Sequence, residues 1–102
     1  MIRKKFKIYL IDAALDDLNR LVEFYKKLMF KFAKNLILEL DQTFKTLQAN
    51  PHTFSAGYDG QFGIINLRKY PVEVFYHIDG QQIIILAIQH KNFNPNYWIE
   101  RV

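Results

Sequence analysis

Residues 65–101 read INLRKYPVEVFYHIDGQQIIILAIQHKNFNPNYWIER, and this stretch decides the fold. Pro71 suits the first position of a strand, where a missing N–H donor does little harm, and Asp79-Gly80 predicts a tight hairpin turn. The run Ile83–Gln89 is apolar on both faces, which predicts a central strand covered by helices on at least one side. With a further strand expected at Phe62–Lys69, this end of the chain predicts a three-stranded antiparallel meander.

The middle strand of the three has the period of two that a half-buried strand needs. One face is expected to carry Val72, Val74, Tyr76 and Ile78, and the other Glu73, Phe75 and His77.

A short strand is predicted at the start of the chain, where Phe6, Ile8 and Leu10 alternate with Lys5, Lys7 and Tyr9. The stretch is basic and apolar, but Lys7 interrupts its apolar part and Asp12 ends it. It is therefore too short for a secretory leader or a membrane span.

The segment that follows has the pattern of two helices. Asp12 is placed where an N-cap is needed, so we expect the first helix to start at Ala13. Apolar residues then recur at helical spacing, with neither Gly nor Pro before Pro51. A single rod of that length would run roughly 55 Å, too long for a domain with a radius of gyration of about 13 Å. We therefore expect a turn near Met29 to Lys31 and an antiparallel helical hairpin that ends at Asn50-Pro51.

The expected order is β-α-α-β-β-β, an α+β fold of two layers. The 102 residues, of which 50% are hydrophobic and 16% aromatic, are expected to form one domain, residues 1–102, with a dry core. The sequence has no cysteine, so redox state does not bear on folding and a cytoplasmic location is expected.

The chain is basic, with 14 Lys plus Arg against 10 Asp plus Glu and a formal net charge of +4. This balance favours a polyanionic or acidic partner through long-range attraction. Lys26, Lys27, Lys31 and Lys34 cluster where the hairpin is expected to turn. They are either a basic end for nucleic acid or an acidic partner, or a solvated helix face.

Several kinds of active site find no support in the sequence. His52, His77 and His90 are far apart, and none has a further ligand at helical spacing, so we expect no metal site. Ser55 lacks the setting of a serine nucleophile. Glycine-rich phosphate loops are absent, and no cofactor is expected.

The C-terminal part does carry the groups that metal-free RNA cleavage needs, namely a base, an acid and cations to hold the phosphorane charge. These are Arg68, Lys69, Tyr76, His77, His90, Lys91, Tyr97 and Arg101.

Each main candidate also has a plain structural interpretation. Arg68 points opposite to Leu67, so it is either a solvated strand residue or a contact to phosphate or a partner. His90 follows a buried strand and is either a structural or a catalytic histidine. Tyr76 shares a face with apolar residues, which favours the core with its hydroxyl at an edge, and Trp98 either packs the tail on the sheet or stacks on a base.

The order of landmarks in this stretch resembles the RelE/ParE superfamily of bacterial type II toxins, and within it the ParE-like branch. The landmarks are Arg68, Tyr70-Pro71, Tyr76, Asp79-Gly80, His90, Pro95, Trp98 and Arg101. The resemblance implies a small growth-inhibiting toxin, associated with plasmid stabilisation, that a cognate antitoxin holds inactive in a hetero-oligomer. The antitoxin segment in this family is typically a helix and an extended stretch wrapped across the toxin.

Two mechanisms divide that superfamily. ParE-like members bind and poison DNA gyrase, whereas RelE-like members cut messenger RNA on the ribosome. The hairpin without an added basic loop, Tyr70-Pro71 and the Pro95-x-x-Trp98 tail favour the ParE-like branch. The family's basic Arg-Arg-Asp-Pro run is replaced here by residues 91–95, Lys-Asn-Phe-Asn-Pro, so any role of those tail arginines does not carry over.

The sequence therefore predicts a ParE-like toxin, with Arg68, Tyr76, Trp98 and Arg101 as partner or target contacts. The alternative is a ribosome-dependent mRNA interferase that uses Arg68, His90, Lys91 and Tyr97. A third interpretation is a non-toxic or decayed interaction module.

Overall fold

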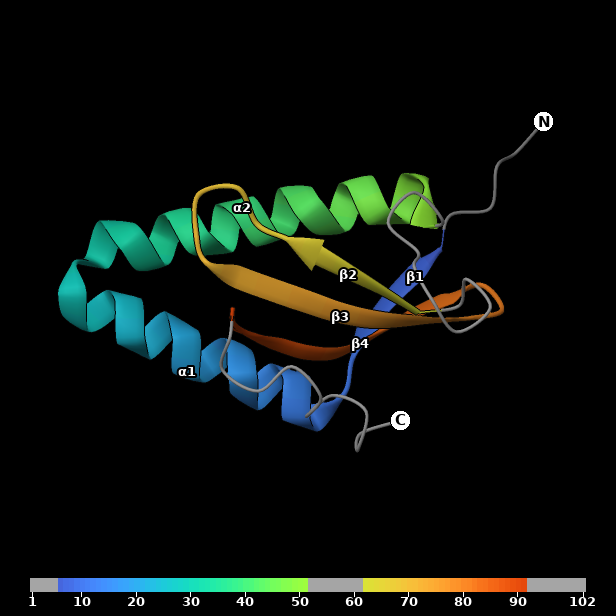
Figure 1. Ribbon diagram of the computed structural model, residues 1–102, viewed down its shortest axis with the longest axis horizontal. Helices are drawn as coiled ribbons and strands as arrows, with labels where there is room; N and C mark the ends of the chain where they lie inside the picture. Colours follow the sequence, from blue (N-terminus) through green and yellow to red (C-terminus); the bar gives the residue numbers. More distant parts are fainter. Residues whose placement is uncertain (1–5, 52–61, 92–102) are drawn as a thin grey trace.

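The computed structural model describes residues 6–51 and 62–91. The elements are β1 (Lys7–Leu10), α1 (Asp12–Leu28), α2 (Phe30–Ala49), β2 (Phe62–Asn66), β3 (Val72–Asp79) and β4 (Gln82–His90). The two helices form an antiparallel hairpin that lies along one face of the sheet (Figure 1). The predicted α+β order of a strand, two helices and three strands is confirmed.

The sheet has the strand order β1-β4-β3-β2. β3 runs antiparallel to both β2 and β4, which confirms the predicted meander. β4 is central, as its apolar faces predicted, and β1 lies parallel to it with Ile8 opposite Ile83. The parallel pairing of the first strand with the last is a tertiary arrangement that the local pattern of β1 does not indicate.

The hairpin turns at Met29, as predicted. Met29 is the one residue between the helices and has an extended backbone (φ −168°, ψ 130°), while its N–H donates to the carbonyl oxygen of Tyr25 at 2.9 Å. The expected N-cap at Asp12 is wrong, because α1 already includes Asp12 and Ile11 precedes it without a side-chain cap. Ile11 is extended and donates its N–H to Ile85, while its carbonyl oxygen accepts the N–H of Leu15, so the helix begins one residue earlier than expected.

The main core lies between the helices and the sheet. It includes Ala14, Leu21, Leu36, Leu40, Leu47, Val72, Val74, Tyr76, Ile78, Ile83 and Ile85. A smaller cluster of Phe75, Leu86 and Ala87 forms separately, and the register of β3 on β4 shifts between Phe75 and Tyr76. The predicted two faces of β3 are therefore observed, with Phe75 buried in the second cluster.

β2 is shorter than predicted, because it ends at Asn66 rather than Lys69. The chain turns instead, with the N–H of Leu67 donating to Val72 at 3.0 Å. Arg68 thus lies in the β2–β3 turn (residues 67–71) and not on a strand. Among the described helices, none is long and apolar enough to cross a membrane.

Candidate functional site

The β2–β3 turn and the end of β4 lie at the same end of the sheet. Val72 pairs with His90, and the N–H of Lys91 donates to the carbonyl oxygen of Pro71 at 2.8 Å. The structure therefore brings Arg68, His90 and Lys91 to one end of the molecule, although they are far apart in sequence.

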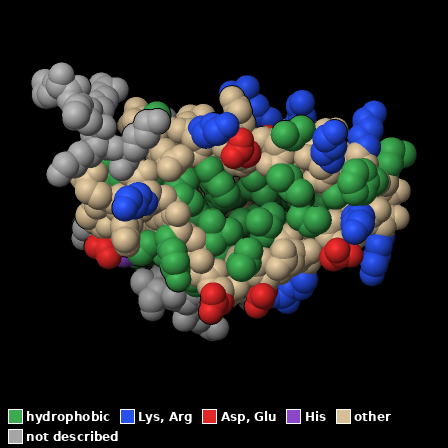
Figure 2. All heavy atoms as spheres, turned by 180° about the vertical axis from the view of Figure 1, so that it is seen from behind, with side chains coloured by type: hydrophobic (Ala, Val, Ile, Leu, Met, Phe, Trp, Pro, Cys, Tyr) green, Lys and Arg blue, Asp and Glu red, His purple; other side chains and the backbone are tan. Residues whose placement is uncertain are grey.

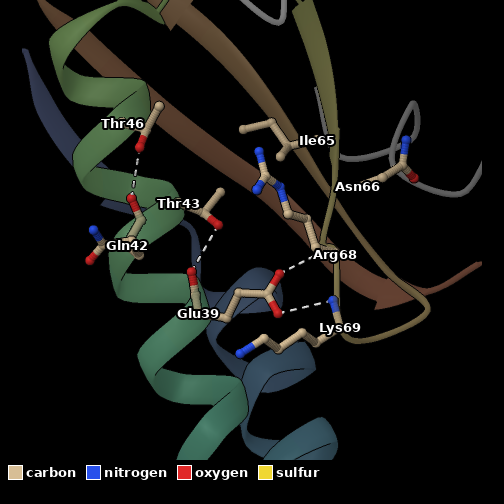
Figure 3. A pocket seen from close by; sticks show the side chains of 8 residues that line it. All are labelled: Glu39, Gln42, Thr43, Thr46, Ile65, Asn66, Arg68 and Lys69. Carbon is tan, nitrogen blue, oxygen red and sulfur yellow. Dashed lines mark hydrogen bonds between the residues drawn. The ribbon is translucent and has the colours of Figure 1, made fainter.

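Arg68 is presented by a turn that Glu39 of α2 holds in place. The two carboxylate oxygens of Glu39 accept the backbone N–H groups of Arg68 at 2.6 Å and of Lys69 at 3.2 Å. These charge-assisted bonds stabilise the turn while both basic side chains stay exposed. Figure 3 shows the Arg68 side chain directed along a pocket between α2 and β2, towards Ile65.

That pocket has a volume of about 350 Å³ and lies between α2 and the end of β2. Thr43 and Thr46 line it from α2, and their hydroxyls donate to the helix carbonyls of Glu39 and Gln42. The Arg68 guanidinium is a fixed fork of donors, suited to a carboxylate or a phosphate group.

His90 is built into an aromatic corner at the end of β4. Its Nε2 lies 2.9 Å from the Tyr25 hydroxyl, and its ring meets Phe24 and Tyr25 edge to face, with centroids 5.3 and 5.6 Å away. Burial lowers the pKa of His90, which favours the neutral imidazole. The ring is half-buried, and its Nε2 already has the Tyr25 hydroxyl as a partner. These contacts fit a structural histidine.

Tyr25 and Tyr70 complete this corner. Their rings meet edge to face at 5.0 Å, and the Tyr70 hydroxyl donates to the carbonyl oxygen of Phe32 at 2.6 Å. Burial, and then the neighbouring Tyr70, raise the pKa of Tyr25, while burial and the charge of Glu39 raise that of Tyr70. Both phenols therefore stay protonated and act as hydrogen-bonding groups. We call Tyr25, Tyr70 and His90 the aromatic corner.

Sequence reasoning missed Tyr25 and Glu39, because both lie on the helices, far along the chain from the residues that they contact. The Tyr70-Pro71 pair was used only as a strand entry and as a landmark of the ParE-like branch. The closeness of Tyr25 to His90 depends on how α1 crosses β4, which the local periodicity does not encode.

Tyr76 is 0% exposed. Its hydroxyl donates to the carbonyl oxygen of Pro51 at 3.0 Å, and its ring covers Gly63. The core interpretation of Tyr76 is the one that the structure shows, and the buried ring presents no surface to a partner. Tyr97, Trp98 and Arg101, which were also expected at the site, lie outside the described residues.

The helical hairpin carries an apolar surface of its own. Leu15, Leu18 and Val22 lie on one side of α1, and Ile37 and Phe44 on one side of α2, at helical spacing. The opposite side of α2 faces the β2–β3 turn through Glu39, so Ile37 and Phe44 face α1. Figure 2 shows hydrophobic side chains gathered in the middle of this face of the molecule, with Lys, Arg, Asp and Glu side chains around them. We call these five residues the apolar trough.

Within residues 6–51 and 62–91, no group of three or more His, Cys, Asp or Glu side chains is arranged to hold a metal ion.

The family profile described as ParE toxin of type II toxin-antitoxin system, parDE, matches residues 8–95. The chain belongs to this family of toxins. The match spans the strand, the helical hairpin and the three-stranded unit, so it covers both the apolar trough and the aromatic corner.

Solved structures show the same fold. A chain of the chromosomal ParDE toxin–antitoxin system from P. aeruginosa superimposes with a TM-score of 0.69 at 20% identity, covering 83% of this chain and 95% of that one. A chain of the RelBE2 toxin–antitoxin complex from Mycobacterium tuberculosis gives 0.55 at 16% identity, covering 86% and 100%. No curated protein matches the sequence significantly.

Proposed function

We propose that this ParE-family toxin inhibits growth by binding a protein target, and that a cognate antitoxin neutralises it by covering the apolar trough. The observation that supports this proposal is the trough itself. Ile37 and Leu15, although apolar, are 49% and 47% exposed, and Phe44 is half-buried. Contiguous exposed apolar surface of this kind marks a site for a protein partner.

The shape of the trough fits an amphipathic helix. The apolar residues of α1 and α2 flank a strip between two antiparallel helices, into which a third helix can place residues at i, i+3 and i+7. The Lys and Arg side chains at the rim would attract acidic residues on the outer edges of that helix, and the Asp and Glu side chains at the rim would attract basic ones. This is the binding mode expected for the helical part of an antitoxin.

Paired substitutions on α2 test the antitoxin site. Ile37→Asp places a charge in the trough, whereas Leu38→Asp places the same charge at the next residue, which is 57% exposed and lies about 100° further round the helix. The wild-type chain should stop growth when induced, and the product of a neighbouring antitoxin gene should restore it. We expect Ile37→Asp to stay toxic and lose at least about tenfold of that rescue, while Leu38→Asp keeps both properties. Rescue of both variants alike would place the antitoxin elsewhere.

DNA gyrase is the first target to test, because the family resemblance implies it. The purified toxin should inhibit supercoiling of relaxed plasmid by gyrase, and preincubation with the antitoxin should restore supercoiling. Full supercoiling in the presence of a chain that stops growth would keep the toxin proposal and move the target to another protein.

A second candidate, the ribosome-dependent mRNA endonuclease, is favoured by the position of Arg68, His90 and Lys91 at one end of the sheet. A cell-free translation reaction in which the 5′ ends of the message are mapped separates the two candidates. Cuts at fixed codon positions that disappear with Arg68→Ala would support the nuclease. Intact message at a toxin concentration that inhibits gyrase would exclude it.

A further inference from the structure

The turn of the helical hairpin exposes apolar side chains that the trough does not include. Leu28, Met29 and Phe30 follow one another and are all exposed, and Phe30 is 67% exposed. We call these three residues the hairpin tip. Only Met29 separates the two helices, so the side chains at this reversal have no further element of the described fold to pack against.

The hairpin tip is surrounded by positive charge. Lys26, Lys27, Lys31 and Lys34 are all exposed, and no Asp or Glu occurs between Glu23 and Glu39. Figure 1 shows the turn of the hairpin at one end of the long axis, and in Figure 2 Lys and Arg side chains gather at the same end.

The β2–β3 turn adds two cations on the same side of the molecule. The Tyr70 hydroxyl donates to the carbonyl oxygen of Phe32, which ties this turn to the first turn of α2. Arg68 and Lys69 are exposed there, and the nearby carboxylate of Glu39 accepts their backbone N–H groups. Glu39 is the acidic residue of α2 that is closest in sequence to the hairpin tip, and its carboxylate is therefore already bonded within the fold.

We propose that the hairpin tip is the surface with which this toxin binds its protein target, and that the target offers an apolar pocket bordered by Asp and Glu. This inference rests on the proposed function and names the part of the toxin that carries it out. It separates two surfaces, with the trough for the antitoxin and the hairpin tip for the target.

The shape and chemistry of the tip favour a protein over other partners. A convex group of Leu, Met and Phe gains affinity when a pocket removes it from water, and a surrounding ring of charge speeds encounter with an acidic surface. Nucleic acid would use the lysines but would leave aliphatic side chains in water. A membrane-surface helix carries its apolar face along several turns, whereas the apolar residues of the tip fall within one reversal of the chain.

Two variants of the tip region test the inference, one for its apolar side chains and one for its positive charge. Phe30→Ser removes the most exposed apolar group, and the double variant Lys27→Glu with Lys31→Glu reverses two of the charges. Tyr9→Ser, at a β1 residue that is 59% exposed, and Lys45→Glu, at the far end of α2, are the matched controls. Each variant is expressed at equal level, its melting temperature is measured, and colony formation after induction is compared with and without the antitoxin.

We expect both tip variants to fold and to bind the antitoxin as the wild type does, but to lose toxicity by about tenfold or more in colony counts, as for residues central to an interface. The two control variants should stay as toxic as the wild type.

Tip variants that kill as well as the wild type would overturn the inference and leave the proposed function intact. A wild-type chain that does not stop growth would instead overturn the proposed function. Loss of antitoxin binding by the tip variants would assign the tip to the antitoxin, against the inference. Sedimentation of the wild type, but not of Phe30→Ser, with phosphatidylglycerol vesicles would assign it to a lipid surface and also overturn the inference.

Discussion

The aromatic corner and the hairpin tip use the same kinds of residue in opposite ways. In the corner, the His90 ring, the Tyr25 hydroxyl and the Tyr70 hydroxyl all have partners within the fold. At the tip, Phe30 is exposed and stands among exposed lysines. Both regions contain aromatic rings beside polar or charged groups, yet one joins α1, β4 and the β2–β3 turn, while the other projects from the end of the hairpin.

The comparison teaches that residue type alone is a poor guide to function in this chain. His90 and Tyr76 have the chemistry of catalytic or binding groups, and the fold engages both in internal contacts. The tip residues have no catalytic chemistry, and their exposure is what makes them candidates for binding. Variants that disturb packed residues should therefore change stability, and variants at the tip should change only binding.

Among the packed residues, the largest loss of stability is expected for a substitution at Gly63. A Cβ atom added there would overlap the ring of Tyr76, which is buried and whose hydroxyl donates to the carbonyl oxygen of Pro51. Gly63→Ala is expected to lower the free energy of unfolding by about 3 kcal/mol, because the buried Tyr76 ring or the backbone would have to shift. Chemical denaturation measures the change.

Gly80→Ala is the control for that substitution. Gly80 has a φ of +60° and nothing within 4 Å of the added Cβ, so it should cost only about 1 kcal/mol through backbone strain. Equal losses at the two glycines would show that Tyr76 packs less tightly on Gly63 than the structure indicates.

The next largest effect is expected at Asp17, a buried carboxylate of α1 whose Oδ2 accepts the N–H of Ile88 at 3.1 Å. The pairing of β1 with β4 ends at Ile85, so this bond continues the attachment of β4 beyond the end of β1. Asp17→Ala should lower the free energy of unfolding by about 2 kcal/mol, because it leaves the Ile88 N–H buried without this acceptor. Asp17→Asn retains an acceptor oxygen and should destabilise the protein less than Asp17→Ala. Hydrogen exchange of the Ile88 amide should be faster in Asp17→Ala than in Asp17→Asn.

A smaller effect is expected on the pH dependence of stability, through His90 in the aromatic corner. Burial lowers the pKa of His90 below its ordinary value of 6.5, so the unfolded chain takes up the proton first as the pH falls. Stability should therefore decrease as the pH falls from about 6.5 through the folded-state pKa. His90→Gln should reduce this slope while keeping a polar partner for Tyr25. Identical slopes for the two proteins, in thermal unfolding from pH 7 to pH 5, would contradict a buried neutral histidine.

The smallest change in stability is expected at the tip. Phe30→Ser should alter the free energy of unfolding by less than about 0.5 kcal/mol, because the ring is mostly in water in the folded protein. A clear loss of stability in the purified toxin would mean that Phe30 packs within the fold, and the contrast between corner and tip would no longer hold.

Much of the fold followed from local patterns. The period of two gave the strands, the helical spacing gave α1 and α2, and the size of a compact domain required the turn that occurs at Met29. The errors concern the boundaries of elements, which contacts outside the local pattern determine. β2 ends early because the backbone N–H groups of Arg68 and Lys69 bond to Glu39, and α1 starts early because the carbonyl oxygen of Ile11 already accepts the N–H of Leu15.

The candidate site was predicted less well. Arg68 was expected on a strand and lies, exposed, in the β2–β3 turn. Tyr25 and Glu39 were not recognised, since each acts through a contact across a wide sequence separation. Lys26, Lys27, Lys31 and Lys34 were noticed at the predicted turn, yet a charge cluster alone did not distinguish a solvated helix face from a binding end. The neighbouring exposure of Leu28, Met29 and Phe30 is the observation that favours a binding end, and exposure is a property of the folded chain.

The sequence by itself determined the order and type of the elements, the central position of β4, the basic character of the hairpin and the resemblance to ParE-like toxins, because these depend on periodicity and on residues close together along the chain. Only the tertiary structure decided that β1 lies parallel to β4, that Tyr25 meets His90, that Tyr76 is buried over Gly63 and that the hairpin tip is left exposed. Those outcomes depend on how two layers pack across long sequence separations, and such packing is fixed by the fit of whole surfaces rather than by any local pattern.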